Sequence, residues 1–575
     1  MYARTAALSM RKPVWHWQAI RRPAAAPGLR GLLLHFWRQS AGGTVWAIWG
    51  LGQFPGEDVS RVSAVRRMGM ARVGRSIGFG ALVLGLAIGS ALAGPTVYAT
   101  GTTIYDPARA WSGYTVLSPL GTQAVIVIDM NGNIVKRWDG YNDSAGGPAR
   151  VLPGGVVIAA AGAHPPHQES LELVERDFGG RVLWQFAHNV QVQTGDGATV
   201  WALRQHHDWA REDFPAGYYS PGVTPAAMPA ASAAAAGEAA AAGEAAAAGE
   251  AAAAGEAPAA GGATAGGVKT LILTHVTHRL PQVADVSLED DRLIELAPDG
   301  KIVWSWTAGD HIDELGFTAE ARAAIKTGGG PNAARSGFDW LHMNSATYVG
   351  QNRWFDAGDR RFAPESVLIS SRQASFVAIV ARDGSIAWKL GPDFSGSKAL
   401  GEIGQIIGQH NAHLIPKGLP GAGDLLVFDN GGASGYGYAS PIAPKGVGAL
   451  VRASSRVLEI NPTTLQLVWS FEAPSTFYSS FIGGAQRLAN GDTLITEGTD
   501  GRVFEVARDG KIVWEYIYPL FSGPRSSNAV YRAYRVPYSW IPQLAHPTEE
   551  AVVPPALGEF RVPTAAARSG ARPAG

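Results

Sequence analysis

A repeated hairpin constrains this chain more than any other feature of its sequence. Each copy has an apolar strand, a tight turn that usually contains Asn-Gly or Asp-Gly, and an Ile/Val-rich second strand that carries tryptophan. Asn-Gly and Asp-Gly supply the positive φ that a two-residue hairpin turn demands, and tryptophan is large enough to fill the wedge between neighbouring sheets. Six copies occur, and they end at Trp138, Phe186, Trp306, Leu390, Phe471 and Tyr516.

A second kind of hairpin lies before or between these copies, as in ARVLPGGVVIAA from Ala149 and NAHLIPKGLPGAGDLLVFDN from Asn411. Two hairpins per unit make a four-stranded sheet. We therefore predict an all-β fold, a six-bladed β-propeller with four-stranded antiparallel blades, closed by an early strand near residues 113–117. Two packed β-sandwiches are the alternative, and they explain six tryptophan-bearing hairpins less economically.

We expect the propeller to span residues 94–553, with two internal interruptions. Residues 228–267 are an Ala/Gly/Glu low-complexity loop, and residues 310–330 read as a helical insertion. Residues 554–575 are rich in Pro, Ala and Arg, which predicts a disordered tail.

The N-terminal part has a different character. Residues 1–67 lack periodicity and read as a disordered leader or as upstream translation, with Met68 or Met70 as the real start. Residues 68–93 combine arginines, an apolar run and a small-residue cleavage pattern, which indicates a signal peptide and an exported, periplasmic protein. The alternative is a membrane anchor through residues 76–93.

Charge and cysteine content exclude several classes of function. Lys+Arg and Asp+Glu are both 48, so no basic field is present to hold nucleic acid. The chain has no cysteine, which removes disulfides, thiol nucleophiles and Cys-ligated zinc together.

Polar residues recur where the inner hairpins begin or end. In a propeller the first strand of each blade lines the central channel, so these residues, far apart in sequence, should converge around one axis. Three imidazoles and one guanidinium there would form an anion-binding site with nucleophilic and acid-base capacity. The candidate catalytic residues are His207, His342, Arg372 and His410, and the candidate substrate-binding residues are His206, Asn344 and Asn430. Trp209, Trp340 and Tyr348 are weaker candidates to stack on an aryl ring.

Each of these residues also has a structural interpretation. A histidine at a strand end is usually a hydrogen-bonded structural residue, and Arg372 could form a salt bridge between blades. Three histidines would also suit zinc or copper, although Arg372 in the same ring would repel a dication. We therefore expect no metal and no cofactor. His188, His275 and His278 sit away from the repeated position.

The motifs HHD from His206, DWLHMNS from Asp339, SVLISSRQ from Ser366 and QHNAHL from Gln409 resemble those of the bacterial aryl-sulfate sulfotransferases. Members of that family are six-bladed periplasmic propellers that move a sulfuryl group from one phenol to another. The resemblance implies that His410 becomes sulfated and that His207, His342 and Arg372 hold the sulfuryl oxygens. It also implies aryl sulfate and phenol as small-molecule partners, without a nucleotide donor.

This chain departs from the best-known members of that family. It lacks their cysteines, it leaves only about twenty residues between Gly94 and the first repeat, and Gln373 stands where a histidine often follows the arginine. Oligomeric state and acceptor preference are therefore not carried over. A quinoprotein-like redox propeller and a non-catalytic ligand- or partner-binding propeller remain the alternatives.

Overall fold

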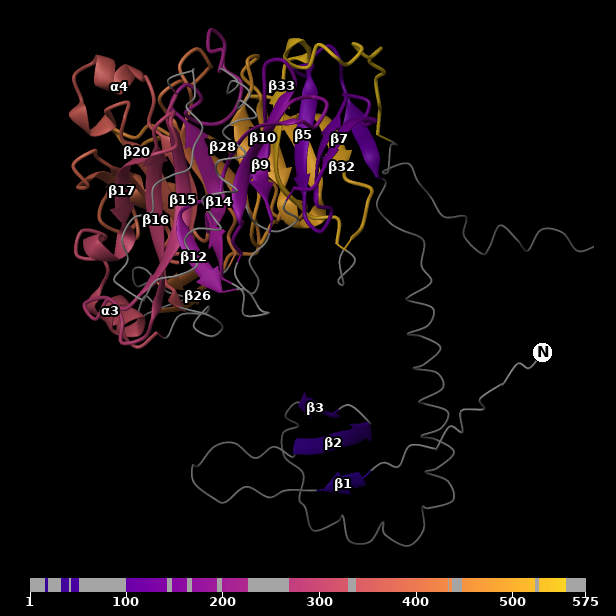
Figure 1. Cartoon of the computed structure of the whole chain (residues 1–575). Coiled ribbons are helices and arrows are strands. Elements are labelled where there is room, and N and C mark those ends of the chain that lie inside the picture. Colours follow the sequence, from indigo (N-terminus) through magenta and orange to yellow (C-terminus); the bar gives the residue numbers. More distant parts are fainter. Residues whose placement is uncertain are drawn as a thin grey trace, which may run out of the picture. The chain divides into compact units, whose positions relative to one another are not determined.

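The computed structural model divides the chain into two compact units, Met1–Val97 and Tyr98–Gly575 (Figure 1). It describes residues 16–18, 33–40, 43–50, 100–141, 147–162, 168–193, 199–225, 268–328, 338–432, 434–436, 447–522 and 527–554. In the first unit, three strands form an antiparallel sheet in the order β1 (His16–Gln18), β2 (Leu33–Ser40) and β3 (Gly43–Gly50). The predicted signal segment 68–93 and the loop 228–267 lie outside the described residues, and so does nearly all of the predicted tail.

Six antiparallel sheets make up the second unit, which confirms the predicted six-bladed β-propeller. Each blade is given from its inner strand outward. The first blade consists of β33 (Val530–Val536), β5 (Tyr114–Pro119), β6 (Ala124–Ile128) and β7 (Ile134–Asp139), and the second of β8 (Arg150–Leu152), β9 (Val156–Ala161), β10 (Glu172–Arg176) and β11 (Val182–Phe186). The third blade consists of β14 (Gln205–Arg211), β15 (Thr270–His278), β16 (Leu288–Leu296) and β17 (Ile302–Thr307).

The other three blades repeat this order. The fourth blade consists of β19 (Met343–Tyr348), β20 (Val367–Ser371), β21 (Phe376–Val380) and β22 (Ile386–Leu390), and the fifth of β23 (His410–Leu414), β24 (Leu425–Asp429), β27 (Arg456–Ile460) and β28 (Leu467–Glu472). The sixth blade consists of β29 (Gly484–Arg487), β30 (Thr493–Glu497), β31 (Arg502–Val506) and β32 (Ile512–Ile517). The inner strands meet around the axis, because β14 contacts β19, β19 contacts β23, β23 contacts β29, and β29 contacts β33.

Short elements decorate the blades. The additional strands are β4 (Gly101–Tyr105) beside β32, β18 (Phe338–Asp339) beside β16, and the ribbons β12 (Val190–Gln193) with β13 (Thr199–Ala202) and β25 (Ser434–Tyr436) with β26 (Val447–Leu450). The helices are η3 (Ala308–His311), α3 (Ala319–Lys326), α4 (Arg353–Asp356), η4 (Arg360–Phe362), α5 (Lys398–Ile403), η5 (Gly498–Asp500) and η6 (Tyr538–Trp540). In the described parts of the chain, no helix has the length and apolar character needed to cross a membrane.

The first blade is closed by strands from opposite ends of the propeller. The early strand predicted near residues 113–117 is β5, and it pairs with β33, so that Tyr114 lies opposite Val536. The repeat predicts no strand after Tyr516, so β33 is a strand that the prediction lacked. Pairing the two chain ends protects both blade edges from further strand addition.

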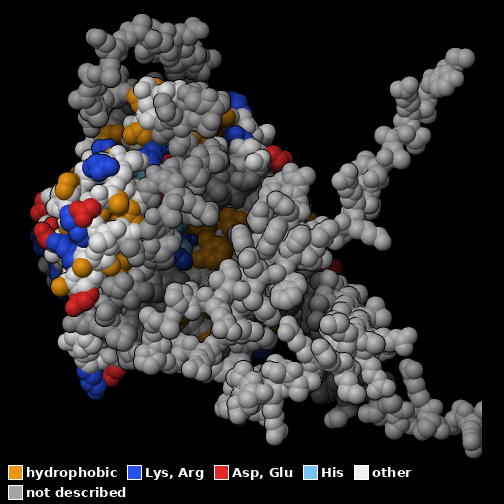
Figure 2. Space-filling view, turned by 90° about the horizontal axis from the view of Figure 1, so that it is seen from below, with side chains coloured by type: hydrophobic (Ala, Val, Ile, Leu, Met, Phe, Trp, Pro, Cys, Tyr) orange, Lys and Arg blue, Asp and Glu red, His pale blue; other side chains and the backbone are white. Residues whose placement is uncertain are grey.

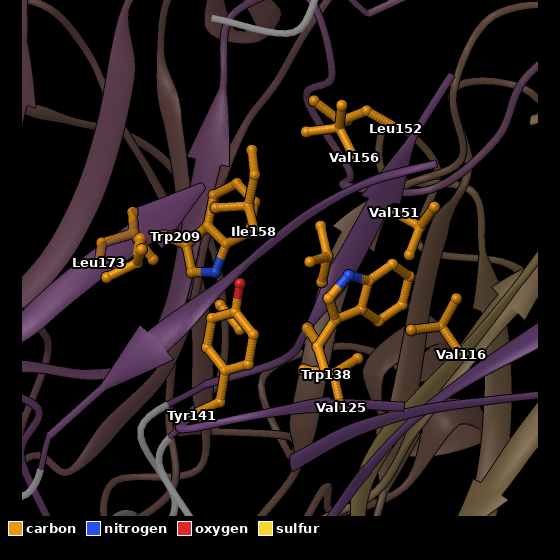
Figure 3. Close-up of a cluster of buried hydrophobic side chains, with 14 of the residues drawn as sticks. Val116, Val125, Trp138, Tyr141, Val151, Leu152, Val156, Ile158, Leu173 and Trp209 are labelled. Carbon is orange, nitrogen blue, oxygen red and sulfur yellow. The ribbon is translucent and has the colours of Figure 1, made fainter. Parts of the chain in front are cut away.

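The outer hairpins have the turn and the wedge that the repeat predicted. Gly132, Gly300 and Gly510 adopt φ of +87°, +82° and +83° at their turns. The tryptophan indoles then donate to the turn of the next blade, as Trp138 Nε1 does to the carbonyl of Asp177 at 3.1 Å. In Figure 3 the Trp138 side chain lies among the labelled valines of β5, β6 and β8.

The predicted helical insertion is confirmed in shorter form. Helix α3 begins after Thr318, whose side chain caps it by accepting from the backbone N–H of Ala321, and Gly328 follows its end at φ +70°. The residues before it form η3 rather than a continuous helix.

Candidate active site

Four inner strands carry β-bulges close to the axis. A bulge places extra residues opposite the partner strand and turns their side chains out of the regular alternation. The bulges lie between Gln205 and Trp209 in β14, between Met343 and Ser345 in β19, between His410 and His413 in β23, and between Val530 and Ala533 in β33. His207, His342 and Asn411, at or next to three of these bulges, adopt φ of +55°, +48° and +52°, a left-handed conformation that is costly for residues other than glycine.

Side chains at three of the bulges tie the successive inner strands β14, β19, β23 and β29 to one another. Asp208 Oδ2 accepts from the backbone N–H of Ala346 at 3.2 Å, and Ser345 Oγ accepts from that of Ala412 at 3.2 Å. Asn411 Oδ1 accepts in the same way from Ala485 at 3.0 Å. Backbone donors are therefore satisfied by the neighbouring blade, which holds the strained residues in place.

The structure brings together the four predicted catalytic residues, which we call the axial cluster: His207, His342, Arg372 and His410. The ring centroids of His207 and His342 are 4.6 Å apart with an interplanar angle of 72°. Arg372 follows β20 directly, and its backbone N–H donates to the carbonyl of His342 at 3.2 Å. His410 begins β23 and is buried.

Asn430 sets the tautomer of His410. Asn430 Nδ2 donates to the carbonyls of Ser479 and Ile482 at 2.7 and 2.8 Å, so its Oδ1 must face the other way. That oxygen lies 2.7 Å from His410 Nδ1, which also lies 3.1 Å from the carbonyl of Gly408. Because both neighbours only accept, Nδ1 carries the proton and Nε2 carries the lone pair. The backbone N–H of Ile482 donates to this Nε2 at 3.3 Å.

Burial keeps His410 neutral. Desolvation, followed by the charge of the Arg372 guanidinium, holds the pKa of His410 well below its usual value, and the bond to Asn430 only partly opposes this. A neutral imidazole with an available Nε2 lone pair is the form that acts as a nucleophile.

Asp339 orients His342. The Oδ2 atom of Asp339 lies 2.5 Å from His342 Nδ1, and both side chains keep some exposure, 15% and 12%. Burial alone would raise the pKa of Asp339, but the charge and the hydrogen bond of His342 hold it well below its usual range. His342 is therefore an imidazole backed by a carboxylate, with Nε2 left for a substrate.

Arg372 is suited to bind an anion. Among the residues that the structure describes, its guanidinium makes no hydrogen bond or ion pair. Burial lowers its pKa, and Asp339 partly offsets that effect. Since a guanidinium stays protonated in proteins, Arg372 provides a fixed positive charge beside His410.

The three predicted substrate-binding residues have different surroundings. His206 stacks on His275 at a centroid distance of 3.6 Å, and its Nδ1 lies 2.9 Å from Nδ1 of His207, so it supports the axial cluster from behind. Asn344 Nδ2 donates to the carbonyl of Gln409 at 2.7 Å, so the other atom of this amide, the acceptor Oδ1, is the one that remains for a ligand. Asn430 uses both ends of its amide to position His410, as described above.

The predicted aromatic stacking residues are wrong. Trp209 and Trp340 are fully buried, and their indoles donate to the carbonyl of Pro148 and to Asp290 Oδ1. Tyr348 is buried as well and donates to Glu295 Oε2. All three are therefore enclosed by protein and hydrogen-bonded to it, and none of them offers a face on which an aryl ring could stack.

Sequence reasoning missed residues that come from elements it did not predict. Tyr531 of β33 donates through its hydroxyl to the carbonyl of His207 at 2.9 Å, and buried Arg532 lies near enough to His410 to lower its pKa further. Ile482, with φ +53°, precedes β29. A regular aromatic and arginine alternation in VYRAYRV was the available signal for β33.

Most of the axial cluster lies in a part of the chain that matches a known protein family. The family model Arylsulfotransferase (ASST) matches residues 267–516. This part of the chain is therefore similar to the arylsulfotransferases. It includes His342, Arg372, His410 and Asn430, whereas His207 and β33 lie outside the matched residues.

No curated protein matches the chain. Similar solved structures include a protein of unknown function from Bacteroides caccae, with a TM-score of 0.37, 10% identity, and coverage of 74% of this chain and 99% of that chain. A europium-containing methanol dehydrogenase has a TM-score of 0.28 and 13% identity, covering 72% of this chain and 68% of that chain. AztD from Citrobacter koseri has a TM-score of 0.27 and 8% identity, covering 73% and 98%.

Proposed function

We propose that this protein moves a sulfuryl group from an aryl sulfate to a phenolic acceptor through a sulfohistidine at His410. The observation that carries the proposal is the 2.7 Å contact between His410 Nδ1 and Asn430 Oδ1, which leaves a neutral imidazole with its Nε2 lone pair beside Arg372. The similarity to the arylsulfotransferases supports this class of activity in general.

In the first half-reaction, His410 Nε2 attacks sulfur and the bond between sulfur and the aryl oxygen breaks. The hydrogen bond from Ile482 to Nε2 must be given up, and that N–H then becomes a donor for a sulfuryl oxygen. Arg372 balances the single negative charge of the SO3 group, and His207 supplies a further donor. The imidazole becomes a cation while sulfur is attached, and Asn430 Oδ1 stabilises the proton that stays on Nδ1.

The leaving phenolate needs a proton, and we assign His342 as its source. Asp339 Oδ2 lies 2.5 Å from His342 Nδ1 and orients the ring, and His342 is one of the two partly exposed members of the axial cluster, together with Arg372. In the second half-reaction the same ring takes the proton of the acceptor phenol, whose oxygen attacks sulfur and releases His410. Each half-reaction exchanges one phenolic oxygen for one imidazole nitrogen on sulfur, so the two are nearly balanced in free energy.

The test is intact-mass analysis of the full chain after mixing with 4-nitrophenyl sulfate. We expect one SO3 adduct per chain, mapped to His410, with release of one equivalent of nitrophenol before an acceptor is added. His410→Asn should give neither product, whereas His188→Asn, which changes a histidine away from the axial cluster, should keep both. A propeller that only binds a ligand would give no adduct in any variant.

We also propose that the protein is exported, on the basis of the charged, apolar and small-residue order within residues 68–93. Mass analysis of the chain recovered from the cell envelope tests this. A mature chain that still carries Trp15 would contradict cleavage at this segment.

A further inference from the structure

Three adjacent strands of the third blade bring together three buried ligating atoms, on the side of His206 that does not face His207. They are Nε2 of His206 on β14, Nε2 of His275 on β15 and Oδ1 of Asp291 on β16, strands that lie side by side in Figure 1. His275 and Asp291 are directly opposite each other across the β15–β16 pair. Asp291 Oδ1 lies 3.3 Å from His206 Nε2 and 3.7 Å from His275 Nε2.

None of these three atoms has a hydrogen-bond partner among the described residues. His206, His275 and Asp291 are 0%, 5% and 0% exposed, so solvent does not satisfy them. Three buried polar atoms that face one another without hydrogen bonds would be costly, unless a common partner lies between them.

The remaining atom of each of these side chains is already committed to a protein group. His275 Nδ1 lies 2.9 Å from Glu169 Oε1, and Asp291 Oδ2 accepts from the backbone N–H of Met343 at 3.0 Å. His206 Nδ1 lies 2.9 Å from Nδ1 of His207. A histidine whose second nitrogen is held by a carboxylate, or by another fixed group, is the usual arrangement around a protein-bound metal ion.

We propose that His206, His275 and Asp291 bind one divalent transition-metal ion, with Zn²⁺ as the ion that fits best. Two imidazoles and one carboxylate suit zinc and its neighbours, and the site offers too few oxygen ligands for calcium. Ligand atoms about 2.0–2.1 Å from a tetrahedral ion are about 3.3–3.4 Å apart. The two separations from Asp291 Oδ1, 3.3 and 3.7 Å, are close to this value, and all three ligand atoms lie within 4.8 Å of one another. One of the two stacked rings must rotate so that both lone pairs converge on the ion.

A second acidic group nearby is less suited to a cation. Glu169, His275 and Glu289 also approach one another. There, however, Arg204 Nη2 already contacts Glu169 Oε1 at 2.7 Å and Glu289 Oε1 at 3.0 Å. The guanidinium supplies the positive charge that an ion would bring.

The competing occupant of the proposed site is a proton. Burial would lower the pKa of His275, but Glu169 and Asp291 raise it to about 9. A metal ion would replace that proton on His275 Nε2. The experiment therefore has to distinguish a bound ion from an imidazolium beside a carboxylate.

The metal site would act on the axial cluster through one hydrogen bond, and this consequence rests on the proposed function. A metal on His206 Nε2 requires the proton of that ring to sit on Nδ1, from which it donates to His207 Nδ1. His207 must then carry its own proton on Nε2, which makes that nitrogen a donor for a sulfuryl oxygen. The sequence predicts that Arg372 repels a dication from the histidines around the axis. The site proposed here is a different one, and carboxylates line it.

The test uses the full chain without an affinity tag, stripped with a chelator and then titrated with Co²⁺ and Zn²⁺. We expect one equivalent of either ion to remain after gel filtration, with visible d–d absorption from the cobalt form. Asp291→Asn and His275→Gln should each weaken binding by at least about tenfold. His278→Gln is the matched control, since His278 is on the same strand but its Nε2 contacts Asp290 at 3.0 Å.

Failure to hold one equivalent of either ion in the wild type, or equal binding in both ligand variants, would overturn the proposal and leave the proton as the occupant. If the variants do not fold, anomalous scattering at the zinc edge from wild-type crystals decides the matter by locating the ion. The SO3 adduct is measured in parallel on stripped and loaded protein. An adduct without metal binding refutes only the metal site, and metal binding without an adduct refutes only the sulfohistidine.

Discussion

Replacing Asn430 by alanine tests the tautomer argument directly. The change removes the acceptor 2.7 Å from His410 Nδ1 and the two donors to Ser479 and Ile482. The carbonyl of Gly408 still accepts from Nδ1, so the reactive tautomer remains accessible. What is lost is a hydrogen bond to a ring that becomes cationic as sulfur attaches. Hydrogen bonds to charged groups are worth about 1.5–3 kcal/mol, which predicts a loss of about 10- to 150-fold in the rate of sulfation.

The assay is the pre-steady-state release of nitrophenol from 4-nitrophenyl sulfate, with the adduct on His410 followed by mass. Asn352→Ala is the matched control. That buried asparagine also donates to two carbonyls, of Gly350 and Phe362, but it caps α4 away from the axis. At about 1 kcal/mol per bond, Asn430→Ala should lose about 3 kcal/mol of unfolding free energy. Asn352→Ala should lose about 4 kcal/mol, because its Oδ1 also accepts from the backbone N–H groups of Trp354 and Phe355. A sulfation rate in Asn430→Ala within about twofold of the control would refute the role given to Asn430.

Four further predictions concern charge, pH and packing. Arg372→Gln should lower kcat/KM for aryl sulfates by about 100- to 1,000-fold, with Arg372→Lys retaining part of the activity; a change of less than about fivefold would contradict its role as the counter-charge. Because the pKa of His410 is well below 6.5, single-turnover sulfation should not fall as the pH is lowered from about 8 to about 6, and a loss of half the rate near pH 6.5 would be inconsistent with a buried neutral nucleophile. For the same reason stability should decline as the pH falls below about 6.5, since the unfolded chain binds a proton that folded His410 does not. Trp306→Ala should reduce the unfolding free energy by about 3–5 kcal/mol in denaturant titrations, whereas Trp306→Phe, which keeps an aromatic ring but loses part of the buried volume and the bond to the carbonyl of Gly384, should cost about half as much.

The repeat could be predicted because its signals are local. An Asp-Gly turn and a tryptophan on the following strand are visible within fifteen residues, and the tryptophan then finds the next blade because blades follow in chain order. Strand β33 lacked such a signal. Its partner β5 lies more than 400 residues earlier in the chain, so the two strands are not joined by a short turn that the sequence could show.

The four members of the axial cluster could be predicted because equivalent positions in a closed propeller converge. The bulges could not, and they explain the errors. A prediction from sequence assumes that each residue of a strand lies opposite one residue of its partner, which fails at the bulge in β14. There His206 stacks on His275, while His207 packs against His342 at the axis. Asn430 was expected to touch substrate, and its amide is instead directed at His410, Ser479 and Ile482, a commitment that only three-dimensional hydrogen bonding reveals.

Closure of the propeller and completion of the axial cluster are one event. Tyr531 on the last strand donates to the carbonyl of His207, and β33 enters the first blade by pairing with β5 at the start of the propeller. The left-handed conformation of His207 costs of order 1–3 kcal/mol and persists only where surrounding contacts fix it. A chain that has not yet joined its ends therefore lacks the contact that holds His207 in register with His342. It follows that the loss of β33 should disorder His207 while leaving the hydrogen bonds between His410 and Asn430, which lie within one blade, in place.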